Sequence, residues 1–275
     1  LKTIQGVLTE AIQDLLGSKV RVCGASRTDA GVSALGQAAL MQIDSPIPTE
    51  NLAAAITDRL PDDIAVVEAV EVPHGFDIIG AAKNKLYCYT IFTGKVRPVL
   101  QIKHCWHVPA KLDTAAMAKA AKMLVGKKDF KSFASAADQH ESSVRTIFRC
   151  DVVSSRVPLT SLGTGVREAS CEKEKMDSCS PPARGQVYPC ESRGRNDNTQ
   201  YAIRNTQYEN DWIYVDVEGD SFLYNMVRNI VGTLVEVGIG RWKPEKIKEI
   251  LEAKDRTAAG PIAPAGGLCL IRIEY

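Results

Sequence analysis

Directly after a predicted strand, the chain carries the stretch Gly24-Ala25-Ser26-Arg27-Thr28-Asp29-Ala30-Gly31-Val32. Small residues on both sides allow the backbone to turn tightly, because glycine tolerates conformations that other residues avoid. A tight turn leaves the Asp29 carboxylate accessible, as functional loop residues usually are. By itself, an aspartate at this position also fits a plain turn former, since its side chain bonds to nearby backbone amides. The stretch therefore marks a strand-to-loop junction whose candidate functional group is a carboxylate.

Predicted helices and strands surround this stretch on both sides. Residues 3–16 place apolar side chains at helical spacing, and Gly17 supplies a helix stop. A strand at residues 19–25 leads into the stretch. Downstream, the pattern predicts a strand at residues 37–43, a helix at residues 49–60 capped by Thr49, and strands at residues 64–72 and 86–92.

The alternation restarts in the second part of the chain. Asp113 caps a helix rich in alanine and lysine that ends before Gly126. The later predicted elements are strands at residues 144–153 and 212–218, helices at residues 222–237 and 244–253, and a closing strand at residues 268–275. Two similar rounds of mixed helices and strands predict an α+β fold with two related halves. We expect these halves to be residues 1–93, which carry Asp29, and residues 94–275.

One segment between two predicted strands lacks periodicity. Residues 156–208 contain Pro158, Pro181, Pro182 and Pro189 and many Ser, Gly, Asn and Thr residues. We predict a long, disordered insertion between strands that would otherwise form a hairpin. A solvated loop and a loop that touches RNA both fit its mixed charge.

The composition predicts a globular protein of the cytoplasm. The chain is 45% hydrophobic and 24% charged, which provides enough apolar side chains for a sizeable core. No run of 18 apolar residues indicates a membrane span, and the N-terminus lacks the layout of a signal peptide. The 34 basic residues against 33 acidic ones give a net charge of +1. This balance excludes a protein that coats nucleic acid through bulk charge, so any RNA contact must be local.

The cysteines and histidines predict no metal site. The eight cysteines are dispersed and form no Cys-x-x-Cys pair, so neither a zinc ribbon nor a thioredoxin-type motif is indicated. In His104-Cys105-Trp106-His107, neighbouring side chains of a strand would point to opposite faces, which does not suit structural zinc. No phosphate-cradling loop of the Gly-x-x-x-x-Gly-Lys-Ser/Thr type occurs. We therefore expect no metal and no cofactor.

Three motifs follow one another along the chain. The first is Ser26-Arg27-Thr28-Asp29-Ala30-Gly31-Val32 with the later Gly36-Gln37, and the second is Lys85-Leu86-Tyr87-Cys88-Tyr89. The third is Phe222-Leu223-Tyr224-Asn225-Met226-Val227-Arg228-Asn229-Ile230-Val231-Gly232. At helical spacing, Arg228 lies beside the edge of an apolar arc, where it also fits an ordinary surface arginine. Together, the motifs resemble those of TruA-type tRNA pseudouridine synthases, and the resemblance runs along the whole chain outside the insertion.

The resemblance implies that the chain converts uridine to pseudouridine in the anticodon stem-loop of tRNA, at positions 38–40, without a cofactor. It implies Asp29 as the nucleophile, Tyr87 as the residue that packs on the flipped uracil and takes part in proton transfer, and Arg228 as the ionic partner of Asp29. Breaking a glycosidic bond and rejoining the fragments needs a group that holds one fragment meanwhile. An ionised carboxylate can do so covalently.

The resemblance also implies an architecture and partners. The two halves would be ferredoxin-like (RRM-like) and would form a mixed antiparallel sheet with helices packed on it, with the catalytic cleft between them. The chain would bind tRNA and form a homodimer. Arg27 would enter the space left by the extruded base, Leu268 would pack on that base, and Lys83 and Lys85 would contact RNA phosphates.

Two features depart from the family pattern. Family members carry a strand ahead of the first helix, whereas this chain begins at that helix, so we expect the N-terminal half to lack its first strand. The segment Phe76-Asp77-Ile78-Ile79-Gly80-Ala81 has isoleucines where the family commonly has Ala-Arg-Phe, which removes a basic side chain at Ile79.

Two other functions stay open. An RNA-binding or tRNA-folding protein of the same fold with impaired catalysis would bind tRNA whether or not Asp29 is present. A hydrolase is the second, because Thr28-Asp29-Ala30-Gly31 is similar to the Asp-Thr-Gly of aspartic proteases. Those enzymes need two such carboxylates sharing a proton, and this chain has no second copy.

Overall fold

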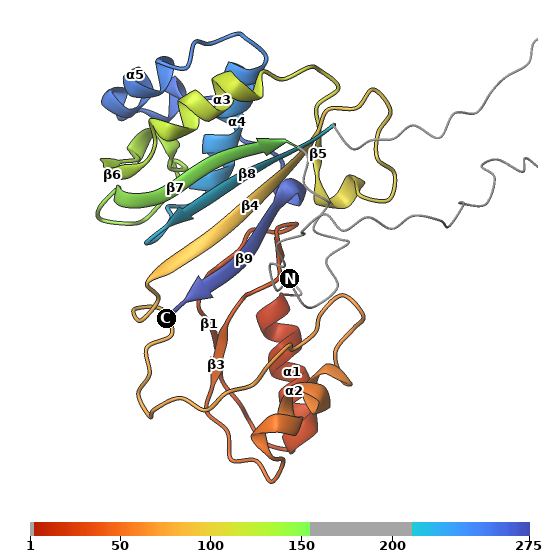
Figure 1. Ribbon diagram of the computed structural model, residues 1–275. Helices are drawn as coiled ribbons and strands as arrows, with labels where there is room; N and C mark the ends of the chain where they lie inside the picture. The colour runs from red at the N-terminus through yellow and green to blue at the C-terminus, as the bar shows by residue number, and fades with distance from the viewer. Residues whose placement is uncertain (1–2, 155–210) are drawn as a thin grey trace, which may run out of the picture. The chain divides into compact units, whose positions relative to one another are not determined.

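The structure, a computed structural model, describes residues 3–154 and 211–275 (Figure 1). These residues belong to one compact unit. The predicted insertion at residues 156–208 lies outside the described residues. Helices and strands mix throughout the described part, which confirms the α+β class expected from the sequence.

The N-terminal part builds a small core between two helices and a two-stranded sheet. Helix α1 (Ile4–Leu16) and helix α2 (Thr49–Thr57) pack beside β1 (Val22–Gly24), which pairs antiparallel with β3 (Ala39–Met41). The predicted ends of α1 are confirmed, since Thr3 Oγ1 accepts from the Gly6 amide and Gly17 adopts a left-handed φ of 65°. The core side chains are Ile12, Val20, Val22, Leu52 and Ile56.

Two predictions in this part are wrong. Residues 64–72 form no strand, and within the described residues no strand pairs with them; Val67 is 81% exposed. Alternating valines alone do not make a strand, because a strand needs a neighbour to satisfy its backbone. Thr49 is not the cap of α2 either. Pro48 holds the cap position, and the Thr49 hydroxyl donates to Glu71 over 2.7 Å.

A seven-stranded mixed sheet forms the centre of the fold (Figure 1). Its order is β2 (Ser33–Ala34), β9 (Leu268–Glu274), β4 (Asn84–Phe92), β8 (Trp212–Gly219), β7 (Val144–Ser154) and β6 (Gly126–Asp129), with β5 (Trp106–His107) paired to β4. The β2–β9 and β4–β5 pairs are parallel, and the other pairs are antiparallel. Ser154 lies opposite Ile213, so the strands on either side of the predicted insertion pair as a hairpin would.

Three helices in the C-terminal part pack with this sheet (Figure 1). They are α3 (Thr114–Lys122), α4 (Met226–Gly238) and α5 (Lys246–Ala253). Asp113 caps α3 as predicted, because its Oδ1 accepts from the Ala116 amide over 2.9 Å. Short 3₁₀ turns lie at Ile102–His104, Lys131–Phe133, Arg256–Ala258 and Ala265–Gly267. The large core includes Tyr89, Ile91, Val215, Val217, Ile230 and Leu234.

Helix α4 starts four residues later than the sequence predicts. Asn225 adopts a left-handed conformation with φ of 62°, which short polar side chains tolerate better than most, and the helix follows it. Further along, α4 lies unusually close to the segment at residues 259–263. A Cβ at Gly232 would overlap the carbonyl oxygen of Pro261, and Thr233 Oγ1 accepts from the Gly260 amide over 3.0 Å. These contacts fix α4, and with it Arg228, against a defined backbone segment.

In the described ranges, no helix combines the length and the apolar character that crossing a membrane requires.

Candidate active site

The Asp29 loop (residues 25–32) leaves the small N-terminal sheet and returns toward the central one. At its start, the Ala25 amide donates to the Ala38 carbonyl over 2.9 Å, and Ala25 is buried. At its end, the Val32 amide donates to the Asp29 carbonyl over 3.0 Å, and Gly31 takes the positive φ of 86° that this turn requires. The loop is therefore fixed at both ends, with Asp29 at its turn.

Arg228 reaches the Asp29 carboxylate from the first turn of α4. Its Nη1 lies 2.7 Å from Asp29 Oδ2, although the two residues are 199 positions apart in the sequence. The same Nη1 donates to Asn225 Oδ1 over 3.0 Å, and Nε donates to the Ala263 carbonyl over 2.8 Å. The three acceptors, on Asp29, Asn225 and Ala263, fix the orientation of the guanidinium, and in this orientation Nη1 points toward Asp29.

The ion pair is largely shielded from solvent but not closed off. The Arg228 side chain is 15% exposed and the Asp29 side chain 24% exposed. Within the described part of the chain, Asp29 Oδ1 accepts no hydrogen bond. The guanidinium of Arg228 thus holds one of the two carboxylate oxygens of Asp29.

Tyr87 on β4 brings a phenol to the same loop. Its hydroxyl lies 3.3 Å from Ser26 Oγ, and its ring meets Phe222 edge-on with centroids 5.2 Å apart. Burial raises the pKa of the Tyr87 hydroxyl, the nearby Asp29 charge raises it further, and the hydrogen bond with Ser26 acts against both. The phenol therefore stays protonated at neutral pH and can donate a hydrogen bond.

Two more side chains hold the backbone of the Asp29 loop. Lys85 is on the same face of β4 as Tyr87, two residues before it, and its Nζ donates to the Ala25 carbonyl over 3.3 Å. Gln37 Nε2 donates to the next carbonyl, that of Ser26, over 2.7 Å. Lys85 is half-buried, and burial lowers the pKa of its ammonium group.

Comparisons with known proteins show the family to which the chain belongs. The sequence model of the tRNA pseudouridine synthase family matches residues 2–79 and 120–275. The chain belongs to this family. It is 34% identical, over 100% of its length and 90% of the relative's, to "tRNA pseudouridine synthase A" of Caldicellulosiruptor saccharolyticus. It is 36% identical to the protein of that name from Moorella thermoacetica, over 99% of this chain and 89% of the relative.

The structure places the remaining residues that the family resemblance singled out. Arg27 is exposed on the Asp29 loop. Leu268 is buried at the start of β9, opposite Tyr89 in the sheet register. Lys83 is exposed just before β4, and its Nζ donates to the backbone carbonyl of Tyr275 over 2.9 Å. Of the sequence-predicted residues, Asp29 and Arg228 touch each other, and Tyr87 and Lys85 reach the same loop.

Several contacts in this family member were missed by sequence reasoning. Asn225 supports Arg228 from the residue before α4, whereas the sequence pattern placed it inside the helix. The sequence contained a signal for this role. Asparagine tolerates the left-handed conformation better than most residues, and its side-chain oxygen can accept a hydrogen bond from an arginine three residues later. The carbonyls of Ala25, Ser26 and Ala263 carry no sequence signal, since every residue has one.

The histidines and the cysteine of His104-Cys105-Trp106-His107 are engaged inside the protein, the histidines by hydrogen bonds and the cysteine by burial. His107 Nε2 lies 2.8 Å from the Gly94 carbonyl, and His104 Nδ1 lies 3.5 Å from Ser33 Oγ. Cys105 is buried, which raises the pKa of its thiol to about 11. Among residues 3–154 and 211–275, no three His, Cys, Asp or Glu side chains are grouped so as to hold a metal ion.

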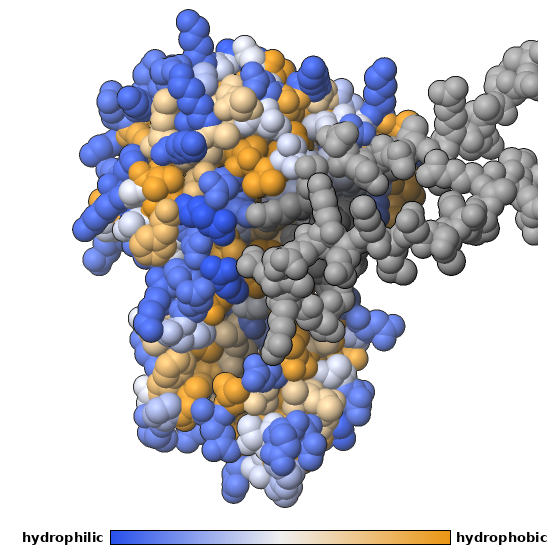
Figure 2. Space-filling model, in the orientation of Figure 1, coloured by the Kyte–Doolittle hydropathy of each residue, from blue (hydrophilic) through white to orange (hydrophobic). Residues whose placement is uncertain are grey.

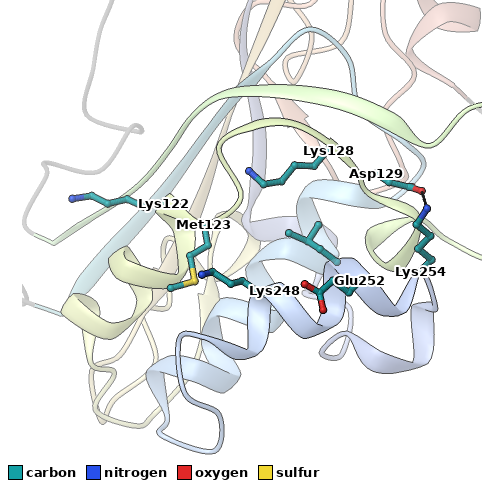
Figure 3. Close-up of a pocket in the computed structure, with 8 residues that line it drawn as sticks. Lys122, Met123, Lys128, Asp129, Lys248, Glu252 and Lys254 are labelled. Carbon is teal, nitrogen blue, oxygen red and sulfur yellow. Dashed lines mark ion pairs between the residues drawn. The ribbon is translucent and has the colours of Figure 1, made fainter.

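An open pocket of about 590 Å³ lies away from Asp29, between α3, β6 and α5 (Figure 3). In Figure 2, hydrophilic and hydrophobic residues are mixed on the face that α3 and α5 present. The pocket is lined by Lys122, Met123, Lys128, Asp129, Lys248, Leu251, Glu252 and Lys254. Lys254 pairs with Asp129 over 3.0 Å, and Lys128 Nζ donates to the Val125 carbonyl. Two of its four lysines are thus engaged inside the protein.

Proposed function

We propose that this chain isomerises uridine to pseudouridine in tRNA and that Asp29 is the nucleophile. One observation carries the proposal: Asp29 Oδ2 and Arg228 Nη1, from motifs 199 residues apart, meet at 2.7 Å beside the Tyr87 phenol. The name of the relatives, tRNA pseudouridine synthase A, supports the reaction and the substrate.

The chemistry follows from the two carboxylate oxygens. Arg228 holds Oδ2, and Oδ1 attacks the target nucleotide at the ribose C1′ or at the uracil ring. The bond between N1 and C1′ breaks, and the covalently held fragment cannot escape while the uracil rotates. C5 then bonds to C1′, the carboxylate leaves, C5 releases a proton and N1 gains one. The product is an isomer, so the step needs no oxidant, reductant or group donor.

Tyr87 and Arg228 have separate roles in this scheme. The Tyr87 ring packs against the flipped uracil, and its protonated hydroxyl donates a proton or a hydrogen bond during rejoining. Arg228 fixes the rotamer of Asp29 and stabilises its negative charge before and after the covalent step. The three acceptors of Arg228 keep this group in place without reorganisation.

The target base must leave its helix before it can react. We assign Arg27, exposed on the Asp29 loop, to the space that the base vacates. Leu268 lies on the strand next to β4 and packs on the extruded base, and Lys83 contacts a phosphate. Lys85 was expected to contact phosphate as well, and its ammonium, like that of Lys83, also donates to a backbone carbonyl, that of Ala25.

The finer architecture belongs to the same proposal. Residues 1–93 and 94–275 form two ferredoxin-like halves with the catalytic cleft between them, and Asp29 and Arg228 come one from each. The enzyme acts as a homodimer in the cytoplasm, on positions 38–40 of the anticodon stem-loop. Light scattering measures the molar mass of the purified protein in solution. A monomer mass at the concentration used in the activity assay would contradict the homodimer.

The decisive experiment compares the wild-type chain with Asp29→Asn. Each protein is incubated with unmodified tRNA, and pseudouridine is mapped by chemical labelling. We expect product at one or more of positions 38–40 with the wild type and none with the variant, while both bind tRNA. A folded wild-type chain that binds tRNA and yields no product would instead point to the RNA-binding alternative.

A further inference from the structure

The start of the Asp29 loop is held by two side chains that are not part of it. Lys85 on β4 donates to the Ala25 carbonyl, and Gln37, beyond β2, donates to the Ser26 carbonyl. The acceptors are consecutive peptide groups, and Ser26 Oγ in addition lies 3.3 Å from the Tyr87 hydroxyl. Three contacts from two separate elements therefore converge on two residues of the loop.

We propose that Gln37 and Lys85 are positioning residues, which form a carbonyl clamp on Ala25 and Ser26 and thereby place Asp29 against Arg228. The proposal rests on the proposed function and adds to it the origin of the loop geometry.

The clamp is needed because of where it acts. Asp29 is only three residues after Ser26. A rotation of the Ser26 peptide group would therefore shift the Asp29 carboxylate relative to Arg228. A misplacement of about 1 Å at a reacting group costs on the order of 100-fold in rate.

The acceptors also explain why these two side chains suit the task. A peptide carbonyl is a hydrogen-bond acceptor, so a side chain that holds it must carry a donor and be long enough to reach it. Lys85 has a long stem, is half-buried two residues before Tyr87, and reaches the Ala25 carbonyl from β4. Gln37 supplies an amide donor whose 2.7 Å bond to the Ser26 carbonyl shows close contact. Neither side chain is directed at the carboxylate itself, so both act through the backbone.

The fold offers a matched control for Gln37. Gln5 Nε2, on α1, donates to the Val22 carbonyl over the same distance of 2.7 Å. Residue type, acceptor type and bond length are the same, but Val22 lies at the far end of β1 from the Asp29 loop. Gln37→Met removes the hydrogen bond to the Ser26 carbonyl, and Gln5→Met removes an equivalent bond to the Val22 carbonyl.

The test combines kinetics with hydrogen exchange. In single-turnover reactions with saturating protein, we expect Gln37→Met and Lys85→Met to lower the rate constant at least about 10-fold, with the Kd for tRNA within about twofold of wild type. Lys85→Arg, which keeps a long cationic donor, should recover most of the rate. In free protein, the Val32 amide, bonded to the Asp29 carbonyl, should exchange faster in both methionine variants. Gln5→Met should change neither the rate nor this exchange.

Two results would overturn the clamp. A Kd that weakens while the rate at saturation stays normal would make Gln37 and Lys85 RNA contacts instead. Unchanged Val32 exchange in both methionine variants would show that they do not hold the loop. Because exchange is measured without RNA, this second result is decisive even if the wild-type chain makes no pseudouridine, an outcome that would count against the proposed function alone.

Discussion

At the scale of single residues, the candidate site depends on how one guanidinium is shared. Arg228 uses Nη1 for both Asp29 and Asn225 and Nε for the Ala263 carbonyl. A planar fork can serve acceptors in several directions at once, whereas an ammonium is a point charge on a flexible stem. The geometry of the group therefore contributes to the site in addition to its charge.

Arg228→Lys tests this distinction. The lysine keeps the positive charge but cannot bond Asp29, Asn225 and Ala263 together, so the carboxylate loses its fixed orientation. We expect the single-turnover rate of pseudouridine formation to fall about 100-fold. Arg241→Lys is the control, since Arg241 also pairs with a carboxylate, that of Glu236, but is exposed and remote from Asp29. Equal rates for Arg228→Lys and wild type would mean that charge alone suffices.

At the scale of elements, sequence patterns predicted the helices better than the strands. Thr3, Gly17 and Asp113 mark helix ends by local hydrogen bonds, which depend on nearby residues only. Residues 64–72 have a strand-like pattern, but whether a strand forms depends on a partner elsewhere in the chain. The sequence motifs led to Asp29, Tyr87 and Arg228. Gln37 belongs to the first motif too, but its bond to the Ser26 carbonyl could not be predicted, because every residue has a backbone carbonyl.

The close packing of α4 against the segment at residues 259–263 gives a prediction at this scale. Gly232→Ala would force the new methyl into the Pro261 carbonyl, so α4 and the segment at residues 259–263 must separate. We expect the free energy of unfolding in urea to fall by about 3 kcal/mol, because backbone cannot yield as a flexible side chain does.

Gly6→Ala is the control for that substitution. Gly6 is also helical, but its added methyl would meet only the Thr3 hydroxyl oxygen, at 3.2 Å. Alanine is the better helix former by about 1 kcal/mol, so this variant should be at least as stable as wild type. If both variants unfold at the same urea concentration, the close approach of α4 to Pro261 is not needed for stability.

At the scale of the whole molecule, carboxylates tie together parts that are distant in sequence. Asp129 on β6 pairs with Lys254 just after α5 (Figure 3). Asp129 also accepts from Ser143 Oγ over 2.5 Å. The Ser143 hydroxyl is the main cause that holds the pKa of Asp129 below its usual value, and Lys254 and the Lys131 amide add to it against the opposing effect of burial. The pKa values of Asp77, Asp138, Asp255, Glu245 and Glu274 are lowered as well.

These shifts make stability depend on pH in one direction. A carboxyl group whose pKa is lower in the folded protein stabilises the fold fully above its unfolded pKa, which is about 3.9 for Asp and about 4.3 for Glu. This contribution disappears as the pH falls through the folded pKa. The midpoint of thermal unfolding should therefore drop between about pH 5 and pH 2. Asp129→Asn should lower the midpoint at pH 7 and make the drop shallower, because the amide does not titrate. Lys254→Met should act in the same direction but less, since it removes a smaller cause of the shift. Parallel curves for wild type and Asp129→Asn would show that this carboxylate does not couple folding to pH.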